Sequence, residues 1–324
     1  MPNLRPTGDR SLSTEFDRLA KAVNNWGRWG PDDQRGTLNH VTADVVRRAA
    51  ALVRNGKTLS LAIPLSEDGP QLGFVRGRTN PERRMIAVHE LIGDPASSAP
   101  ADLDGVRFND DAVSMGLQAA THWDGLAHVS YAGRMWNGVD PAEVDEAGAH
   151  LLGVERQGPL VSRGVLLDVA RATGVDRLDG GLPLTPEHLE AAETMAGVTV
   201  EPGDIVLLRT GQMQFLHAGD KLGYAISTAG PSLQTVEWFH ARSVAAVATD
   251  NLSFEVYPGE KDGLYLPVHM LHIVEMGLVQ GQNFDLEALA ADCAADGRYE
   301  FMLVAAPEPF VAACGAPVVP VVIK

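Results

Sequence analysis

Cysteine is scarce in this sequence, with only Cys293 and Cys314 among 324 residues. Two cysteines cannot build a cysteine-rich zinc site, and the sequence contains no C-x-x-C spacing. A structural disulfide is not expected in a reducing cytosol. Any bound metal must therefore be held by His, Asp, Glu, Gln or Asn side chains, which is typical of a catalytic site rather than a structural zinc site.

Long apolar runs and basic residues are also in short supply. No apolar stretch approaches the roughly 20 residues needed to span a bilayer. The segment 1–18 is polar and lacks the apolar core of a signal peptide, so we expect a cytoplasmic protein without a membrane partner. Lys and Arg number 26 against 42 Asp and Glu, which gives a net charge of -16. Such an acidic chain repels phosphate backbones, so we expect no nucleic-acid partner. The charge itself says little about the small-molecule substrate that we expect.

Nucleotide-binding motifs are missing too, since neither G-x-G-x-x-G after a strand nor G-x-x-x-x-G-K-[ST] occurs. Short β-rich runs and helical stretches instead alternate without a regular βαβ rhythm. Strands are expected at 58–65, 85–91, 164–170, 204–210, 244–250, 301–306 and 317–323. Helices are expected at 42–55, from 186 onward, at 232–242 and at 285–296.

This mixture predicts an α/β fold. We expect a single domain over residues 1–324, with a partly antiparallel, barrel-like central sheet flanked by helices. Residues 1–56 are expected to form an N-terminal helical extension packed on that domain. Thr42 is a candidate N-cap for its second half, and Gly56 a stop signal.

The informative stretch is Q-A-A-T-H-W-D-G-L-A-H, from Gln118 to His128. Strand side chains alternate in direction, so an extended chain would place Gln118, His122 and Asp124 on one face. An amide oxygen, an imidazole and a carboxylate there suit a divalent metal. Gly125 is expected to bend the chain and bring His128 near, where it could act as a general base or acid.

Two alternatives stay open from the residues alone. An isolated H-x-D spacing also occurs where a histidine is simply hydrogen-bonded to a carboxylate. His269 and His272 have the i,i+3 spacing of a pair on one helix face, which fits either metal binding or ordinary packing.

The stretch from Gln118 to His128 resembles the H-x-G-T-H-x-D-x-P-x-H motif of the cyclase family, which includes bacterial kynurenine formamidase and isatin hydrolase. The resemblance extends over most of the chain. Further similar segments are N-W-G-R-W-G-P-D-D at 25–33, G-T-L-N at 36–39, R-G-V-L-L-D-V at 163–169, G-D-I-V-L at 203–207 and N-F-D-L-E at 283–287. The resemblance implies the cyclase fold and a homodimer or homotetramer.

The resemblance also implies roles for single residues. His122 and Asp124 match metal ligands, His128 matches the catalytic base, and His269 matches a histidine that binds a second metal in two-zinc members. Gln118 stands in place of the first motif histidine, and Gln282 in place of a glutamate ligand. Isatin hydrolase-like members carry glutamine at the latter position and hold one manganese. Amide oxygens are harder ligands than imidazole, so we expect one divalent metal, with Mn(II) favoured over Zn(II).

The expected function is a metal-dependent hydrolase acting on an amide or ester bond of a cyclic amide, lactone or N-acyl aromatic compound. Trp26, Trp29 and Trp123 are candidates for the wall of an aromatic substrate pocket, although tryptophan also simply fills cores. One alternative is a metal-dependent cyclase or dehydratase. Another is a ligand-binding paralogue that has lost its metal.

Overall fold

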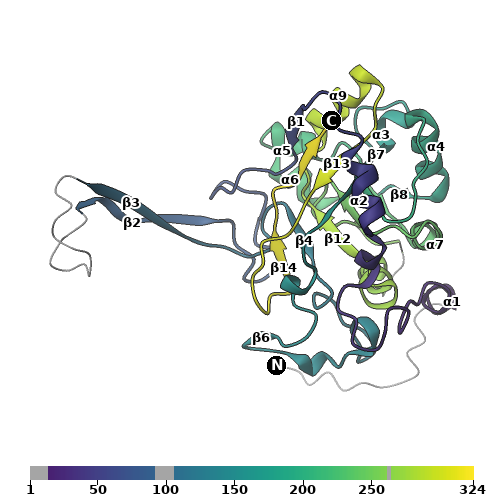
Figure 1. Ribbon diagram of the computed structural model, residues 1–324, viewed down its shortest axis with the longest axis horizontal. Helices are drawn as coiled ribbons and strands as arrows, with labels where there is room; N and C mark the ends of the chain where they lie inside the picture. Colours follow the sequence, from purple (N-terminus) through teal and green to yellow (C-terminus); the bar gives the residue numbers. More distant parts are fainter. Residues whose placement is uncertain (1–13, 92–105, 261–263) are drawn as a thin grey trace.

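A mixed, curled sheet of nine strands forms the centre of the molecule (Figure 1). The computed structural model describes residues 14–91, 106–260 and 264–324. Across the sheet the strands are β1 (Thr58–Ser60), β15 (Val321–Ile323), β13 (Glu300–Val304), β7 (Val161–Asp168), β9 (Ile205–Arg209), β11 (Ala246–Thr249), β12 (Val279–Gln282), β4 (His122–Asp124) and β14 (Gly315–Pro317). The four strands from β7 to β12 are parallel, and the outer pairs are antiparallel. The predicted α/β domain with a partly antiparallel sheet is confirmed.

The central strands bury both of their faces, as parallel strands in α/β proteins do. Side chains along β7 alternate between two cores: Leu166 belongs to one, and Val165 and Leu167 to the other. In β9, Leu207 lies in the same core as Leu166, and Val206 lies in the same core as Val165. This period of two explains why the runs read as strands in the sequence.

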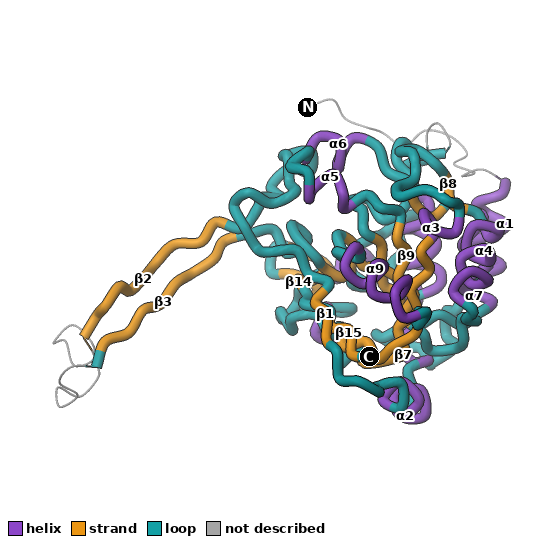
Figure 2. Tube along the Cα trace, turned by 90° about the horizontal axis from the view of Figure 1, so that it is seen from above, coloured by secondary structure: helices purple, strands orange, loops and turns teal. Residues whose placement is uncertain are grey.

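Helices cover both sides of the sheet (Figure 2). Side chains of α1, α4 and α7 pack into one core, and those of α9 into the other. The helices are α1 (Thr14–Ala22), α2 (Ala43–Ala50), α3 (Val169–Ala172), α4 (Pro186–Ala196), α5 (Met213–His217), α6 (Lys221–Ile226), α7 (Val236–Ala241), α8 (Pro267–His269) and α9 (Glu287–Asp296). A π-helical segment, η6 (Met270–Met276), continues α8. No helix within the described ranges has both the length and the apolar character needed to cross a bilayer.

Short elements complete the chain. The 3-10 helices are η1 (Gly36–His40), η2 (Trp136–Gly138), η3 (Pro141–Glu143), η4 (Val154–Arg156) and η5 (Leu233–Thr235). Two minor strand pairs are β8 (Pro183–Leu184) with β10 (Gly230–Pro231) and β5 (Val144–Asp145) with β6 (Gly148–Ala149).

A two-stranded hairpin projects far from the body (Figures 1 and 2). It consists of β2 (Glu82–Leu91) and β3 (Arg107–Ser114), paired antiparallel. Only the first of these strands was expected, and it begins three residues earlier than predicted. Most of its side chains are exposed, including Met85, Ile86 and Val88.

Several predicted elements are shorter in the structure, among them the helix expected at 42–55 and the strand expected at 58–65. Thr42 caps α2 as expected, by accepting a hydrogen bond from the Val45 amide, but the helix ends at Ala50. It stops there because the chain turns toward the C-terminus, where the Gly56 amide donates to the Lys324 carbonyl at 2.8 Å. Strand β1 ends at Ser60, and the Ile63 amide donates to the Thr121 hydroxyl instead of continuing the ladder.

Candidate active site

Strand β4 places His122 and Asp124 on the face opposite Trp123. The Trp123 ring packs edge-on against Phe284, at 5.2 Å between centroids, and its indole N–H donates to the Ala305 carbonyl. Gly281 on the neighbouring strand leaves room for it, since a Cβ there would lie 2.9 Å from the ring. His122 and Asp124 are both fully buried on the other face. The predicted alternation therefore holds within this strand.

The expected extension back to Gln118 is wrong. Residues 117–120 form a turn, in which the Ala119 amide donates to the Gly116 carbonyl at 3.0 Å, and the strand begins only at His122. Gln118 nevertheless lies close to the site by another route. A Cβ on Gly315, which is paired with Asp124, would lie 2.8 Å from Gln118 Nε2 and 3.5 Å from Asp124 Cα.

His122 presents an unprotonated ring nitrogen to Asp124. Its Nδ1 lies 2.7 Å from the Ala120 carbonyl, which only accepts, so the ring proton resides on Nδ1. Nε2 is then a bare lone pair, 3.4 Å from Asp124 Oδ1. Asn283 supports this arrangement because its amide also donates to the Ala120 carbonyl, at 2.9 Å.

His269 is fixed in the same manner by Glu255. Its Nδ1 lies 2.5 Å from Glu255 Oε1, and the backbone amides of Val268 and His269 also donate to that carboxylate. The remaining nitrogen, Nε2, lies 4.0 Å from Asp124 Oδ2. Gln282 places its side-chain amide between the two, 2.6 Å from Asp124 Oδ2 and 3.3 Å from His269 Nε2.

His128 lies on the cavity side of Asp124. Its Nε2 is 3.4 Å from Asp124 Oδ1, and 22% of its side chain is exposed, against 1% for His122. Burial lowers the pKa of His128 more than the Asp124 carboxylate raises it, and the His269, His122 and Arg78 charges lower it further. The neutral imidazole is therefore favoured, which suits a proton acceptor.

The charge of Asp124 is set by its histidine neighbours. Burial by itself would raise its pKa, but the His128 and His122 imidazoles outweigh burial and hold the pKa of Asp124 well below its usual range. The carboxylate is therefore ionised in the interior, where an uncompensated charge is costly.

Two buried acceptors face each other here without a donor. Within the described part of the chain, neither His122 Nε2 nor Asp124 Oδ1 has a hydrogen-bond partner. Histidine ligands of metals commonly donate their other N–H to a carbonyl or carboxylate, as His122 and His269 both do. A divalent cation would satisfy both acceptors. However, no group of three or more His, Cys, Asp and Glu side chains among the described residues is arranged to hold a metal ion.

His269 and His272 both pack against Phe254 but have different polar partners. His272 is fully buried against the rings of Phe239 and Phe254, and its Nδ1 lies 2.9 Å from Gln280 Nε2. Burial lowers the pKa of His272 to about 3. It is a neutral core residue, and only His269 faces Asp124.

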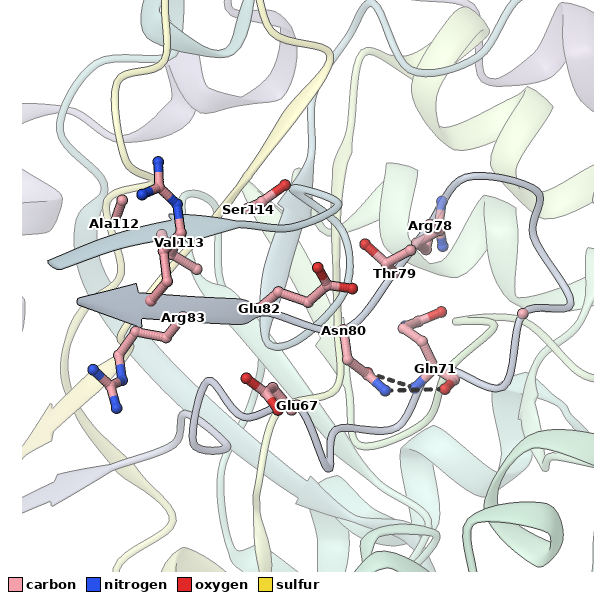
Figure 3. A pocket seen from close by; sticks show the side chains of 12 residues that line it. Glu67, Gln71, Arg78, Thr79, Asn80, Glu82, Arg83, Ala112, Val113 and Ser114 are labelled. Atoms are coloured by element: carbon pink, nitrogen blue, oxygen red, sulfur yellow. Dashed lines mark hydrogen bonds between the residues drawn. The ribbon is translucent and has the colours of Figure 1, made fainter. Parts of the chain in front are cut away.

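A cavity of about 700 Å³ opens above these groups. His128, His269 and Gln282 line its floor. The other described lining residues are Gln71, Leu72, Phe74, Val75, Arg76, Arg78, Ala225, Ile226, Leu252, Ser253, Tyr257, Tyr265 and Leu266. A second cavity, of about 790 Å³, lies at the base of the hairpin and shares Gln71 and Arg78 with the first (Figure 3).

The three tryptophans expected to wall the substrate pocket are not among the described residues that line this cavity. Trp123 is in the core, Trp26 donates its indole N–H to the Val274 carbonyl at 2.7 Å, and Trp29 packs against Trp136. Their large apolar surface is used for packing. The aromatic residues of the cavity are Phe74, Tyr257 and Tyr265, for which the sequence analysis made no prediction.

The sequence analysis predicted no functional role for Glu255 or Arg78. Each is distant in sequence from His122 and Asp124, and neither belongs to a motif of recognisable spacing. A signal for Glu255 exists only in three dimensions, where its carboxylate meets the start of α8.

Comparison with known proteins shows the family to which the chain belongs. The family model "Putative cyclase" matches residues 59–256, more than half of the chain. A crystal structure described as a novel cyclase is 37% identical, covers 94% of this chain and 99% of that one, and superposes with a TM-score of 0.84. The chain belongs to this cyclase family.

More distant structures share the fold. Isatin hydrolase A from Ralstonia solanacearum is 21% identical, with a TM-score of 0.60 and coverage of 83% of this chain and 92% of that one. A predicted metal-dependent hydrolase from Bacillus stearothermophilus is 16% identical, with a TM-score of 0.51 and coverage of 83% and 98%. No functionally curated protein matches the sequence.

Proposed function

We propose that this protein is a metal-dependent hydrolase that cleaves the acyl C–N or C–O bond of a cyclic amide, a lactone or an N-acyl aromatic compound. The observation that carries the proposal is the facing pair of acceptors, His122 Nε2 and Asp124 Oδ1, buried beside a cavity that also exposes His128. The names of the structural neighbours, an isatin hydrolase and a metal-dependent hydrolase, support the same class.

His122 and Asp124 would hold one divalent cation, completed by the amide oxygen of Gln118 or Gln282 or by His269 Nε2. A bound cation of this kind polarises a carbonyl and acidifies water. Amide and carboxylate oxygens are hard ligands, so we propose Mn(II) ahead of Zn(II). Glu255 and the Ala120 carbonyl keep His269 and His122 in the tautomers that leave Nε2 free.

His128 moves the protons. It accepts one from the attacking water as the water oxygen bonds to the acyl carbon, and it returns that proton to the departing nitrogen or oxygen as the acyl bond breaks. The products are a carboxylic acid and an amine or alcohol, joined in one molecule when the substrate is cyclic. Asp124, 3.4 Å from His128 Nε2, stabilises the imidazolium that forms in between.

The test is a hydrolysis screen. The protein, supplied with Mn(II) or Zn(II), is assayed on matched lactones, cyclic amides and N-acyl anilines in water labelled with heavy oxygen. Label in the product carboxylate supports the proposal. Failure of every substrate class with the metal-loaded protein, or full turnover by His128→Ala, contradicts it.

The name of the matched family favours a second candidate, a metal-dependent cyclase or dehydratase. Such an enzyme closes a ring or releases water and leaves no label in a carboxylate. A third candidate, a ligand-binding protein without metal, is favoured by the lack of a ready three-residue metal group among the described residues. It predicts less than about 0.1 metal per chain even after Mn(II) or Zn(II) is added, where a catalytic site would fill.

We also propose that the protein forms a homo-oligomer. The hairpin supports this, because an isolated two-stranded hairpin is only marginally stable in water. Met85, Ile86 and Val88 on β2 are 44%, 51% and 58% exposed, which leaves an apolar surface for a second copy of the chain. Light scattering of the full chain would give its mass in solution, and a monomer at micromolar concentration would contradict the proposal.

A further inference from the structure

The cavity above Asp124 differs in charge from the rest of the chain. The sequence carries 42 acidic against 26 basic residues, yet none of the described residues lining this cavity is Asp or Glu. Arg76 and Arg78 are both among them. The carboxylates of Asp124 and Glu255 lie beneath the floor and are both buried. A positively charged cavity entrance on an acidic protein raises the local concentration of anionic ligands.

Arg78 is free to bind such a ligand. Its side chain makes no ion pair or hydrogen bond with any described residue, whereas the partly buried Arg163 and the buried Arg209 are each held by carboxylates. A guanidinium that is half-buried and unpaired has all five donors available, and its planar fork fits a carboxylate in two-point contact.

The loop that carries Arg78 is anchored. Gln71 and Asn80 close its base with two hydrogen bonds, at 2.9 and 3.1 Å (Figure 3). The Gln71 side chain also donates to the Ala119 carbonyl at 2.9 Å, just before β4. The Arg78 amide closes a turn onto the Val75 carbonyl. These bonds fix the backbone of the loop at Arg78 relative to the strand that holds His122 and Asp124.

The same loop supplies apolar surface. Phe74 and Val75 are 64% and 48% exposed, and Tyr257 and Tyr265 across the cavity are 38% and 70% exposed. Ligand sites combine such aromatic and apolar walls with a few polar groups that orient the ligand. We propose that the cavity accepts substrates with an aromatic or apolar body and a negatively charged group, and that Arg78 binds that group. This inference rests on the proposed function for the identity of the cavity as the substrate site.

Calorimetric binding of two probes tests it: 3-phenylpropionate and its neutral amide, 3-phenylpropanamide, each titrated into the protein as purified. A charge-assisted contact predicts that the wild type binds the carboxylate at least about tenfold more tightly than the amide. Arg78→Gln should bring the two affinities within about twofold, and Arg78→Lys should keep part of the preference. Arg83→Gln, on the exposed hairpin arginine that pairs with Asp111, is the matched control and should retain the full preference.

Equal affinities in the wild type, no binding of 3-phenylpropionate, or a preference that survives in folded Arg78→Gln would each overturn the assignment. The readout is binding, so a protein that hydrolyses nothing still reports it. Failure of the hydrolysis screen and failure of this inference are therefore separate results.

Discussion

The floor of the cavity and its mouth, where Arg76 and Arg78 lie, would be stabilised by ligands of opposite charge. Beneath the floor, the carboxylate of Asp124 and the bare nitrogen of His122 are buried acceptors without a donor among the described residues, and a cation would satisfy them. At the mouth, Arg78 is a donor without an acceptor in the same part of the chain, and an anion would satisfy it. The two sets lie on separate segments, one on strand β4 near the edge of the sheet and the other on the loop that carries Arg78. A substrate that bridges them would present a carbonyl to the floor and a negative group to the mouth.

The largest expected effect comes from His128, which lies on the floor and is exposed to the cavity. His128→Ala should lower kcat by roughly a hundredfold to ten-thousandfold, the usual contribution of a positioned acid or base. Metal content should stay at the wild-type value, because the variant retains the proposed metal ligands His122 and Asp124. His150→Ala, at an exposed histidine paired with Asp145, is the control and should be silent. Loss of metal together with activity in His128→Ala would show that this histidine is a metal ligand and not only the base.

A smaller loss is expected from Glu255, which positions His269. Glu255→Gln removes the carboxylate that holds His269 Nδ1 and two backbone amides. Outer partners of this type are worth about 10–100-fold in metal affinity or activity. Metal titration of the variant measures the effect on affinity. An unchanged affinity with a lowered melting temperature would show that Glu255 supports only the start of α8.

A smaller effect is expected on the pH profile of activity, which depends on both His128 and Arg78. His128 must be neutral to accept a proton, and burial lowers its pKa below the ordinary 6.5. Activity should therefore persist below pH 6.5 and fall only at more acidic pH, where the imidazole becomes protonated. Because the Arg78 charge contributes to the lowered pKa, Arg78→Gln should shift the acid limb of kcat/KM upward. An acid limb above pH 6.5 in the wild type would contradict the assignment of His128.

The smallest effect should come from a residue outside the cavity. Trp26→Phe removes the hydrogen bond to the Val274 carbonyl and should cost about 1 kcal/mol of stability. KM should be unchanged, since Trp26 does not line the cavity. Chemical denaturation and steady-state kinetics measure the two quantities. A raised KM without a change in stability would restore the original expectation for the tryptophans.

The parts of this molecule that could be predicted are those in which a local pattern fixes the structure. The apolar runs that became β7 and β9 and the Thr42 cap of α2 are of this kind, as is the alternation of His122 and Asp124 about Trp123. The resemblance to the cyclase family added the fold.

The sequence predictions failed where the structure depends on contacts between residues that are far apart in the sequence. Gln118 lies in a turn because β4 is only three residues long, and the sequence does not reveal that length. His269 and His272 have equivalent spacing, but only the first meets Glu255 and Asp124. Arg78 gains its significance from a cavity assembled by several separated segments.

Metal binding tests the central account most directly. Wild-type protein and Asp124→Asn are stripped with chelator, refilled with Mn(II), freed of excess ion and analysed for metal content. About one Mn(II) per chain in the wild type, and less than about 0.1 in a folded Asp124→Asn, is the predicted result for a site that needs this carboxylate. A wild-type protein that takes up neither Mn(II) nor Zn(II), or an Asp124→Asn variant that binds as well as wild type, would contradict it.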